Sequence, residues 1–281
     1  MPASCIWFLF FRCRPKRIQL QSKGQRAVKT QNVVVVGLGE VGKPLLELVS
    51  QHHNAIGVDI TPPTDKVDHV DVLHVCYPFQ ISDFIGETAR YIEMFKPAVT
   101  VINSTVAVGT TRHVAKRAGV PVVNSPVRGK HARMLQELSE YTKFLGATDN
   151  ESAWKAAEHF ESLGLTTKVL ASPEATELAK LTETTYFGLM IAWAQELERY
   201  CDQTDVKYDE VMSFYDEIKF FPTVKYFPGI IGGHCVMPNI KILNRLGGSV
   251  ILDAIQMSNE MKAERETHKT AVVSKAETVA V

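Results

Sequence analysis

The sequence has few cysteines, no net charge and no long apolar run. Its 281 residues include five cysteines, an odd number, and no pair with C-x-x-C spacing. We therefore expect neither a disulfide framework nor a metal site, and we expect a reducing compartment, the cytoplasm. Basic and acidic residues both number 31, which argues against a surface for nucleic acid. No apolar run approaches the ~20 residues that span a bilayer, so no membrane association is expected.

The N-terminal stretch has no acidic side chain before Glu40. A short apolar run at 5–11 precedes four basic residues between Arg12 and Arg17, whereas a secretory signal places its charges before a longer apolar run. Two interpretations remain open: an organelle transit peptide, for which serine is scarce, and a basic extension without a fold. We expect the second, over residues 1–30.

What the sequence does have is an apolar strand that ends in a glycine turn. Residues 33–36 are four consecutive valines, which make both faces of a strand apolar, as in a central parallel strand between helices. Gly37, Gly39 and Gly42 then complete G-x-G-x-x-G. The first allows a tight turn, the second lets a pyrophosphate approach the backbone, and the third lets the next helix pack closely. Together with the flanking strand and helix, the turn predicts dinucleotide binding.

Two further strand ends carry polar residues suited to a nucleotide. A short apolar run at 55–58 ends at Asp59, where an acid accepts hydrogen bonds from a ribose and repels a 2′-phosphate, so NAD is favoured over NADP. An ordinary loop acid is the alternative. Another apolar run, at 98–103, leads into small hydroxyl side chains. We expect NAD to contact Gly37, Gly39, Glu40, Val41, Gly42, Asp59, Ser104 and Thr105.

Strands and helices alternate along residues 31–170 at lengths typical of βαβ units, which predicts an α/β fold with a doubly wound parallel sheet of the Rossmann type. The expected strands are 33–36, 55–58, 70–76, 98–103, 120–124, 142–146 and 167–170, and the expected helices are 81–95, 110–118 and 150–162.

From residue 171 the pattern becomes helical. Ser172 is a candidate N-cap with Pro173 just inside it, which predicts a long helix to about residue 200. Further helices are expected at 208–215 and 248–265, on either side of a glycine-containing loop, in a helical middle domain at 171–268 followed by a tail at 269–281. We expect Trp154 and Trp193 in the core, with Trp193 also available to a dimer contact.

Four motifs together resemble the UDP-glucose/GDP-mannose (nucleotide-sugar) 6-dehydrogenase family. They are V-V-V-V-G-L-G-E-V-G-K-P at 33–44, N-S-T-V-A-V-G-T-T at 103–111, E-L-A-K-L at 177–181 and the most specific, P-G-I-I-G-G-H-C at 228–235. The resemblance covers about residues 32–265. It implies an NAD-binding Rossmann domain at 31–170 and a helical middle domain that dimerises through its 175–200 helix, the first two of the family's three domains.

The resemblance also implies a mechanism and three catalytic residues. Family members oxidise a sugar C6 alcohol to a carboxylate with two NAD, through a cysteine-bound thiohemiacetal and then a thioester. Cys235 corresponds to the nucleophile, Lys180 to the cation that stabilises the oxyanion, and Thr105 to the residue beside nicotinamide and the reacting water. From the residues alone, Cys235 could instead be a small buried hydrophobe, and Lys180 a solvated lysine paired with Glu177.

Three positions depart from the family pattern. Val127 stands where a glutamate is expected, Thr184 where an asparagine is, and Asn239 where an aspartate is. Because neither Val127 nor Asn239 carries a carboxylate, we expect a second oxidation that is impaired relative to the first.

A basic cluster, Arg128, Lys130, His131 and Arg133, follows the 120–124 strand and either binds an anion or is merely solvated. We expect the substrate, an anionic small molecule, to contact Arg128, Lys130, His131, Gly232, Gly233 and His234.

Three functions remain open. The first is an NAD-dependent oxidoreductase that acts on an alcohol of a sugar-nucleotide-like substrate. The second is a non-catalytic, NAD-binding dimer with a regulatory or interaction role. The third is a dehydrogenase of the β-hydroxyacid type, against which the G-G-H-C loop counts.

Overall fold

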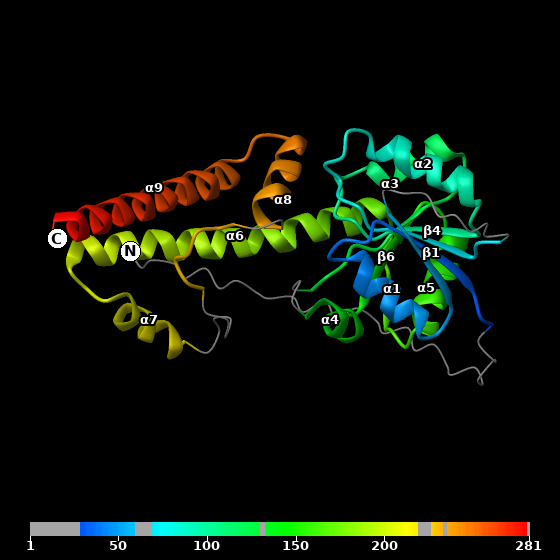
Figure 1. Cartoon of the computed structure of the whole chain (residues 1–281), viewed down its shortest axis with the longest axis horizontal. Helices are drawn as coiled ribbons and strands as arrows, with labels where there is room; N and C mark the ends of the chain where they lie inside the picture. The colour runs from blue at the N-terminus through cyan, green and yellow to red at the C-terminus, as the bar shows by residue number, and fades with distance from the viewer. Residues whose placement is uncertain (1–28, 60–68, 130–132, 219–225, 233–234, 280–281) are drawn as a thin grey trace, which may run out of the picture.

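The computed structural model describes residues 29–59, 69–129, 133–218, 226–232 and 235–279, which form a sheet-containing lobe and an elongated helical lobe (Figure 1). In the described residues seven strands form one sheet in the order β2-β1-β3-β4-β5-β6-β7. They are β1 Asn32–Val36, β2 Asn54–Val58, β3 Val72–Val75, β4 Val99–Ile102, β5 Val123–Asn124, β6 Lys143–Ala147 and β7 Thr167–Val169. The predicted α/β fold with a doubly wound sheet is confirmed.

The four valines of β1 are buried alternately on the two faces of the sheet. Val33 and Val35 pack into one core with residues of α1 (Gly42–Ser50), α4 (Met134–Glu140) and α5 (Asn150–Ser162). Val34 and Val36 pack into the other with residues of α2 (Phe84–Phe95) and α3 (Thr110–Ala118). Figure 1 shows these helices on opposite sides of the sheet. A strand that is apolar on both faces is thus explained by helices on both faces.

The sheet departs from a fully parallel arrangement at β6. Strands β1 to β5 are parallel, but β6 pairs antiparallel with β5, with Val123 opposite Ala147. The connection between them contains only the short helix α4, and Lys143, the first residue of β6, reaches the backbone at the carboxyl end of β5. The chain therefore re-enters the sheet from the edge at which it left, which reverses the strand direction.

A chain of hydrogen bonds crosses the buried space between β3 and α5. The amide nitrogen of Asn103 donates to the Val101 carbonyl (3.2 Å), which only accepts, and to Nδ1 of His74 (3.0 Å). His74 therefore carries its hydrogen on Nε2 and donates to Nε2 of His159 at 2.9 Å. His159 in turn donates from Nδ1 to Oε1 of Gln31 at 2.7 Å. Burial lowers the pKa of His74, and lowers that of His159 to about 3, so both rings are neutral.

The helical lobe is built on α6 (Pro173–Thr204), which starts next to β5 and β6 at the side of the sheet-containing lobe and extends away from it (Figure 1). Ser172 Oγ accepts from the Ala175 N–H at 3.3 Å, and Pro173 stands in the first turn, as predicted. The other helices are α7 Tyr208–Asp216, α8 Val236–Leu243 and α9 Val250–Val279, with a 3₁₀ turn at Asn244–Leu246. Helices α4 and α8 were not predicted, and α9 continues beyond the predicted end at residue 265.

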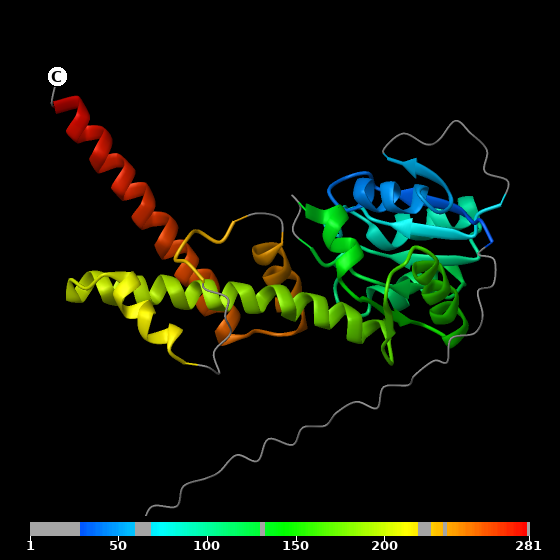
Figure 2. The ribbon, with the colours of Figure 1, turned by 90° about the horizontal axis from the view of Figure 1, so that it is seen from below.

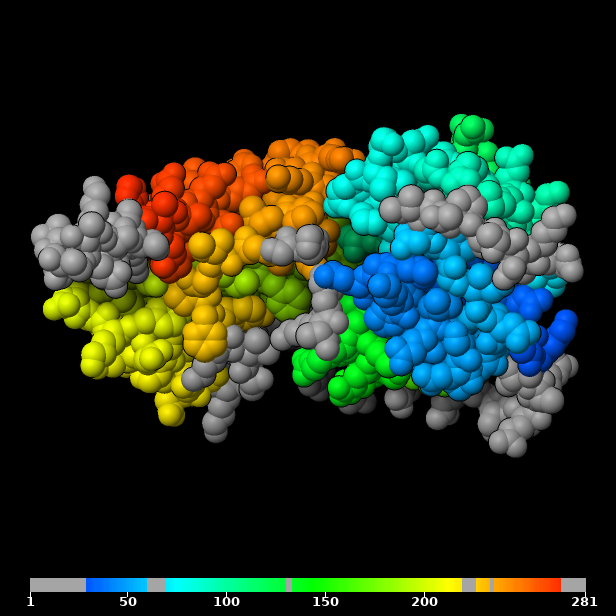
Figure 3. Space-filling view, viewed as in Figure 1, coloured from blue at the N-terminus to red at the C-terminus, as the bar shows by residue number. Residues whose placement is uncertain are grey.

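Helix α9 crosses α6 at an angle, and its C-terminal half points away from the rest of the chain (Figure 2). The space-filling view shows the two lobes joined at a narrower waist (Figure 3). None of the helices in the described ranges is long and apolar enough to cross a membrane. The expected core position of the two tryptophans was wrong: Trp154 is 56% exposed and Trp193 is 47% exposed. The availability of Trp193 to a dimer contact stays a prediction.

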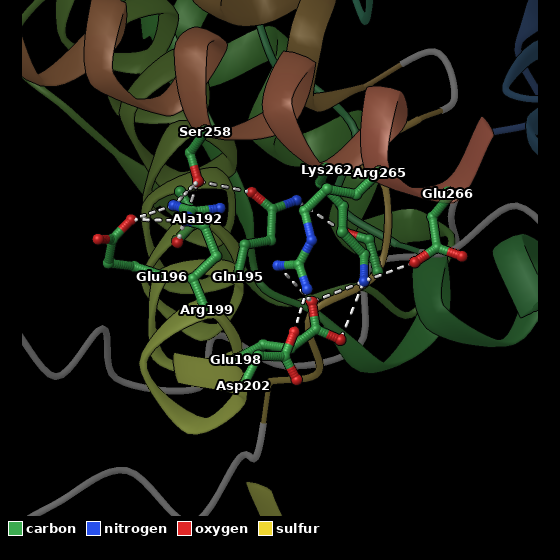
Figure 4. A network of polar contacts seen from close by, with 11 residues as sticks. Ala192, Gln195, Glu196, Glu198, Arg199, Asp202, Ser258, Lys262, Arg265 and Glu266 are labelled. Atoms are coloured by element: carbon green, nitrogen blue, oxygen red, sulfur yellow. Dashed lines mark hydrogen bonds and ion pairs between the residues drawn. The ribbon is translucent and has the colours of Figure 1, made fainter. Parts of the chain in front are cut away.

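Helices α6 and α9 share an apolar cluster that includes Ala192 and Ile255, and they are also joined by a network of polar side chains (Figure 4). The Ser258 hydroxyl donates its one hydrogen to Oε1 of Gln195 at 2.9 Å or to the Ala192 carbonyl at 3.3 Å. Further along, Lys262 reaches both oxygens of Glu198, at 3.0 and 2.7 Å. Polar contacts depend on direction and spacing more than apolar ones do, so this network fixes the register between the two helices.

Candidate functional site

The glycine turn has the crowding and the opening that a pyrophosphate site needs. Gly37 has φ +89°, and a Cβ there would lie 2.6 Å from the backbone nitrogen of Tyr77. A Cβ on Gly42 would lie 1.8 Å from the Gly37 carbonyl oxygen, so only glycine lets α1 start this close to β1. At Gly39, by contrast, a Cβ would meet nothing within 4 Å. The exposed backbone at Gly39, in front of the first turn of α1, thus fits an approaching phosphate.

This turn lies at the topological switch point of the sheet. Strand β1 pairs with β2 on one side and with β3 on the other, and the crevice outside such a switch is where open α/β sheets bind ligands. Asp59 is exposed directly after β2, on the same edge. The structure therefore brings the predicted glycines and Asp59 to one edge, in an arrangement that fits an adenine dinucleotide.

Ser104 and Thr105 follow β4 at the same edge of the sheet. The Ser104 hydroxyl is buried and donates to the Tyr77 carbonyl at 2.6 Å, so it links the ends of β3 and β4. Thr105 is half-buried. Both lie in the predicted region, with Ser104 engaged by the backbone and Thr105 more accessible.

Two buried contacts fix the start of α6 against this edge. Thr176 donates to the side-chain oxygen of Asn124, at the end of β5, at 2.7 Å. Glu177 accepts from the backbone N–H groups of Gly109 (2.6 Å) and Thr111 (2.8 Å), at the start of α3. Burial raises the pKa of Glu177, while these hydrogen bonds act in the opposite direction. Glu177 is thus a link between α3 and α6, and the alternative in which it pairs with a solvated Lys180 was wrong.

One turn further along α6, Lys180 lies in a largely buried position, with a 14% exposed side chain. Its ammonium lies 3.8 Å from Oε2 of Glu183 on the same helix. Burial lowers the pKa of Lys180, and the electrostatic effects of Glu183 and Cys235 act against this shift. A buried ammonium within electrostatic reach of a cysteine is suited to stabilising negative charge on a ligand oxygen.

Cys235 is exposed and directly precedes α8, which packs against α6. A Cβ on Gly188 would lie 2.8 Å from Cγ1 of Val236, so this mid-helix glycine lets α8 approach α6 closely. The loop before Cys235 is held from α9 by Asn259, which accepts from the Ile231 N–H (2.7 Å) and donates to the Ile231 carbonyl (3.0 Å). Three helices therefore determine where Cys235 lies.

The three positions that depart from the family pattern have different environments. Val127 is buried in the sheet core, 6% exposed, with no polar partner available to a valine side chain. Asn239 donates to the Thr184 hydroxyl at 2.9 Å, and both side chains are buried. The two polar residues that depart from the family pattern, Asn239 and Thr184, thus form a hydrogen bond that links α8 to α6.

The predicted basic cluster is only partly within the described residues. Arg128 contacts Oε1 of Glu183 at 3.0 Å, and Arg133 contacts Glu137 at 2.9 Å. Each is thus paired with a carboxylate. Lys130, His131, Gly233 and His234 lie outside the described residues, and Gly232 is exposed.

Sequence reasoning missed Lys143, a buried lysine at this edge. Its ammonium donates to the Ser125 carbonyl at 3.0 Å, and burial lowers its pKa to about 7. Burial also raises the pKa of nearby Cys76 to about 12, so that thiol stays protonated. Glu183 and Asn259 were missed as well, because nothing in the local sequence distinguishes them from surface residues.

Comparison with known proteins agrees with the motifs. Residues 174–264 match the model of the UDP-glucose/GDP-mannose dehydrogenase family, central domain. The chain is 26% identical over 255 residues to UDP-N-acetyl-D-mannosamine dehydrogenase of Methanocaldococcus jannaschii, covering 73% of this chain and 60% of that protein. The resemblance to nucleotide-sugar dehydrogenases is thereby confirmed, and the chain spans about 60% of the length of this relative.

Solved structures agree with the fold. The UDP-D-ManNAc dehydrogenase of Pyrococcus horikoshii superimposes with a TM-score of 0.73 at 21% identity, over 88% of this chain and 72% of that one. A UDP-glucose dehydrogenase from Pyrobaculum islandicum gives a TM-score of 0.69 at 18% identity, over 85% and 70%. At these identities the likeness concerns the fold.

Proposed function

We propose that this chain is an NAD-dependent dehydrogenase that oxidises an alcohol carbon of a sugar nucleotide. The observation that carries the proposal is the largely buried Lys180, fixed beside the carboxyl edge of the sheet and within electrostatic reach of Cys235. The site thus has a cation that can stabilise an oxyanion and a nucleophile that can attack a carbonyl carbon. The glycine turn at the same edge of the sheet fits a pyrophosphate. The related M. jannaschii protein, named for a UDP-N-acetylated sugar, supports the substrate class.

In the proposed reaction NAD, when bound, accepts a hydride from the alcohol carbon. The glycine turn would hold its pyrophosphate and Asp59 its adenosine ribose, which favours NAD over NADP. Lys180 stabilises the oxygen that loses its proton, and Thr105 holds a water beside it. Cys235 then adds to the aldehyde carbon, so that a second oxidation gives a thioester.

Hydrolysis of the thioester, which releases the carboxylic acid, is the step that most needs a group to accept a proton from water. Val127 has no group that accepts a proton, and Asn239 has an amide already bound to Thr184. We therefore propose that the second oxidation and thioester hydrolysis are slower than the first oxidation.

We also propose a homodimer formed through α6. Tyr186, Leu189, Trp193 and Tyr200 recur at intervals of three, four and seven residues along this helix, and each is at least 39% exposed. Such spacing keeps one stripe of a helix apolar, and a second copy of the helix would cover it.

The test is NADH absorbance during incubation with NAD and a panel of sugar nucleotides and hydroxy acids. NADH formation with a UDP-N-acetylated sugar, lost in Lys180→Ala, would support the proposal. Turnover of hydroxy acids alone would favour the β-hydroxyacid type. Tight NAD binding with no turnover of any alcohol would favour a non-catalytic dimer.

A further inference from the structure

Glu183 lies between the two basic side chains of the candidate site. Both Nε and Nη2 of Arg128, from the loop after β5, lie 3.0 Å from its Oε1. Its other oxygen, Oε2, lies 3.8 Å from the ammonium of Lys180. The carboxylate thus spans the gap between the sheet-containing lobe and the buried lysine of α6.

Arg128 is itself held in place, and so it orients Glu183. The guanidinium lies over the rings of Tyr141 and Phe144, 5.1 and 5.8 Å from their centroids. Because this fixed group engages Oε1, the remaining oxygen is directed toward Lys180. A separation of 3.8 Å is too long for a direct hydrogen bond, which leaves Oε2 able to accept one from a water that lies to one side of the two groups.

The charged residues around Lys180 also distinguish the Glu183–Lys180 pair from an ordinary surface ion pair. The charged or titratable groups that interact with Lys180 include Glu183 on the same helix, Arg128 from the β5 loop and Cys235 from the start of α8, and also Lys143 of β6. Exposed lysine–glutamate pairs three residues apart contribute only a few tenths of a kcal/mol. Here the carboxylate is two-thirds buried and lies among the groups assigned to the reaction.

We propose that Glu183, positioned by Arg128, accepts the proton of the water that releases the acid from Cys235. The proposal rests on the function proposed above and gives the site the carboxylate that Val127 lacks. A water O–H bond breaks and its proton passes to Glu183, while the water oxygen forms a bond to the thioester carbon. The carbon–sulfur bond then breaks, and its electron pair leaves on the Cys235 sulfur, beside the Lys180 ammonium.

The experiment compares Glu183→Gln with Glu174→Gln. Glu174 is a matched control because it lies on the same helix, is 30% exposed against 32% for Glu183, and pairs with Arg112 through the same two kinds of guanidinium nitrogen. Each protein is mixed with NAD and UDP-N-acetylmannosamine, and both NADH and the intact mass of the protein are followed. We expect Glu183→Gln to form NADH in a first turnover, then to retain a sugar adduct on Cys235, with acid release slowed by about 10²–10⁴-fold. Glu174→Gln should release acid like the unmodified chain.

A second arm tests proton transfer directly. Glu183→Ala should regain acid release on addition of formate, a small carboxylate, whereas chloride at equal ionic strength should not restore it. Acid release by Glu183→Gln as fast as by Glu174→Gln would overturn the role of Glu183 and leave the proposed dehydrogenase intact. Absence of NADH formation by the unmodified chain would overturn both. Thermal unfolding of the two glutamine variants should differ little, since each glutamine keeps the shape of the glutamate and its amide oxygen can still accept a hydrogen bond from the neighbouring arginine.

Discussion

Asn239 and Thr184, 55 residues apart, form a buried hydrogen bond of 2.9 Å between α8 and α6. The Thr184 hydroxyl donates back to the Lys180 or Leu181 carbonyl, both at 3.0 Å, and therefore accepts from Asn239. The contact ties the helix that begins after Cys235 to the turn that carries Lys180. The two polar side chains among the three departures from the family pattern are thus a hydrogen-bonded pair.

A double-mutant cycle should reveal this pairing. We expect Asn239→Asp to destabilise the chain by more than Asn239→Ala, which should cost about 1–3 kcal/mol, because a buried carboxylate would face the oxygen of Thr184. Thr184→Asn in the same chain should recover part of the loss, since its amide donates to the new carboxylate. Urea denaturation measures the coupling, expected at roughly 1 kcal/mol or more. Thr182→Val, at an exposed position of the same helix, is the control, and strictly additive changes would contradict the pairing.

The buried histidine pair predicts loss of stability in mild acid. Because burial lowers the pKa of His74 and His159 in the folded state, only the unfolded chain takes up protons as the pH falls below about 6.5. The free energy of unfolding should then decrease by roughly 1.4 kcal/mol per pH unit for each histidine, with no contribution from either above pH 7. Urea denaturation between pH 7 and 5 should give a shallower dependence for His159→Gln. The same substitution at exposed His113 should leave the slope unchanged.

Asp59 predicts preference for NAD. We expect the unmodified chain to bind NAD at least roughly tenfold more tightly than NADP, a difference of about 1.4 kcal/mol, because the carboxylate repels a 2′-phosphate. Asp59→Ala should narrow that gap, mainly by weakening NAD. Isothermal titration measures both affinities, and Glu47→Ala, on the exposed side of α1, is the control. Equal affinities in the unmodified chain would exclude this role for Asp59.

The proposed dimer can be tested with two exposed tryptophans. Trp193→Glu places a charge within the apolar stripe of α6 and should give a monomer by light scattering at micromolar concentration. Trp154→Glu, on α5 of the sheet-containing lobe, changes a tryptophan of similar exposure outside the stripe and should leave the mass unchanged. A monomeric mass for the unmodified chain, or dimers in both variants, would contradict an interface through α6.

The sequence was most informative where structure depends on local pattern. The helix at 110–118 was predicted to its bounds because it lies between glycines. Strand β1 was predicted at 33–36, one residue shorter than it is, because four valines have no other common setting. The reversal of β6 was not predicted, since direction depends on where the connection returns to the sheet. Helix α8 was missed because Pro238 and the preceding glycines suggested a loop.

In the candidate site, too, some residues could be predicted from the local sequence and others could not. Gly37, Gly42 and Lys180 are recognisable from spacing and from motifs that span few residues. The sequence left open whether Glu177 pairs with Lys180, because the choice between Lys180 and the start of α3 is made only when α6 docks on the sheet. Glu183 likewise gains its neighbours from a loop more than fifty residues earlier in the chain.

Because α6 is anchored at Thr176 and Glu177, any tilt of the helix pivots about its first turns, next to the candidate site. At 1.5 Å per residue, Lys180 lies roughly 5 Å along the axis from Glu177, whereas Tyr200 lies roughly 35 Å away. A tilt of about 10° about that anchor would displace the far end by roughly 6 Å and Lys180 by less than roughly 1 Å. The far end of α6 therefore has wide freedom to adjust to a neighbour while the lysine keeps its place relative to the sheet.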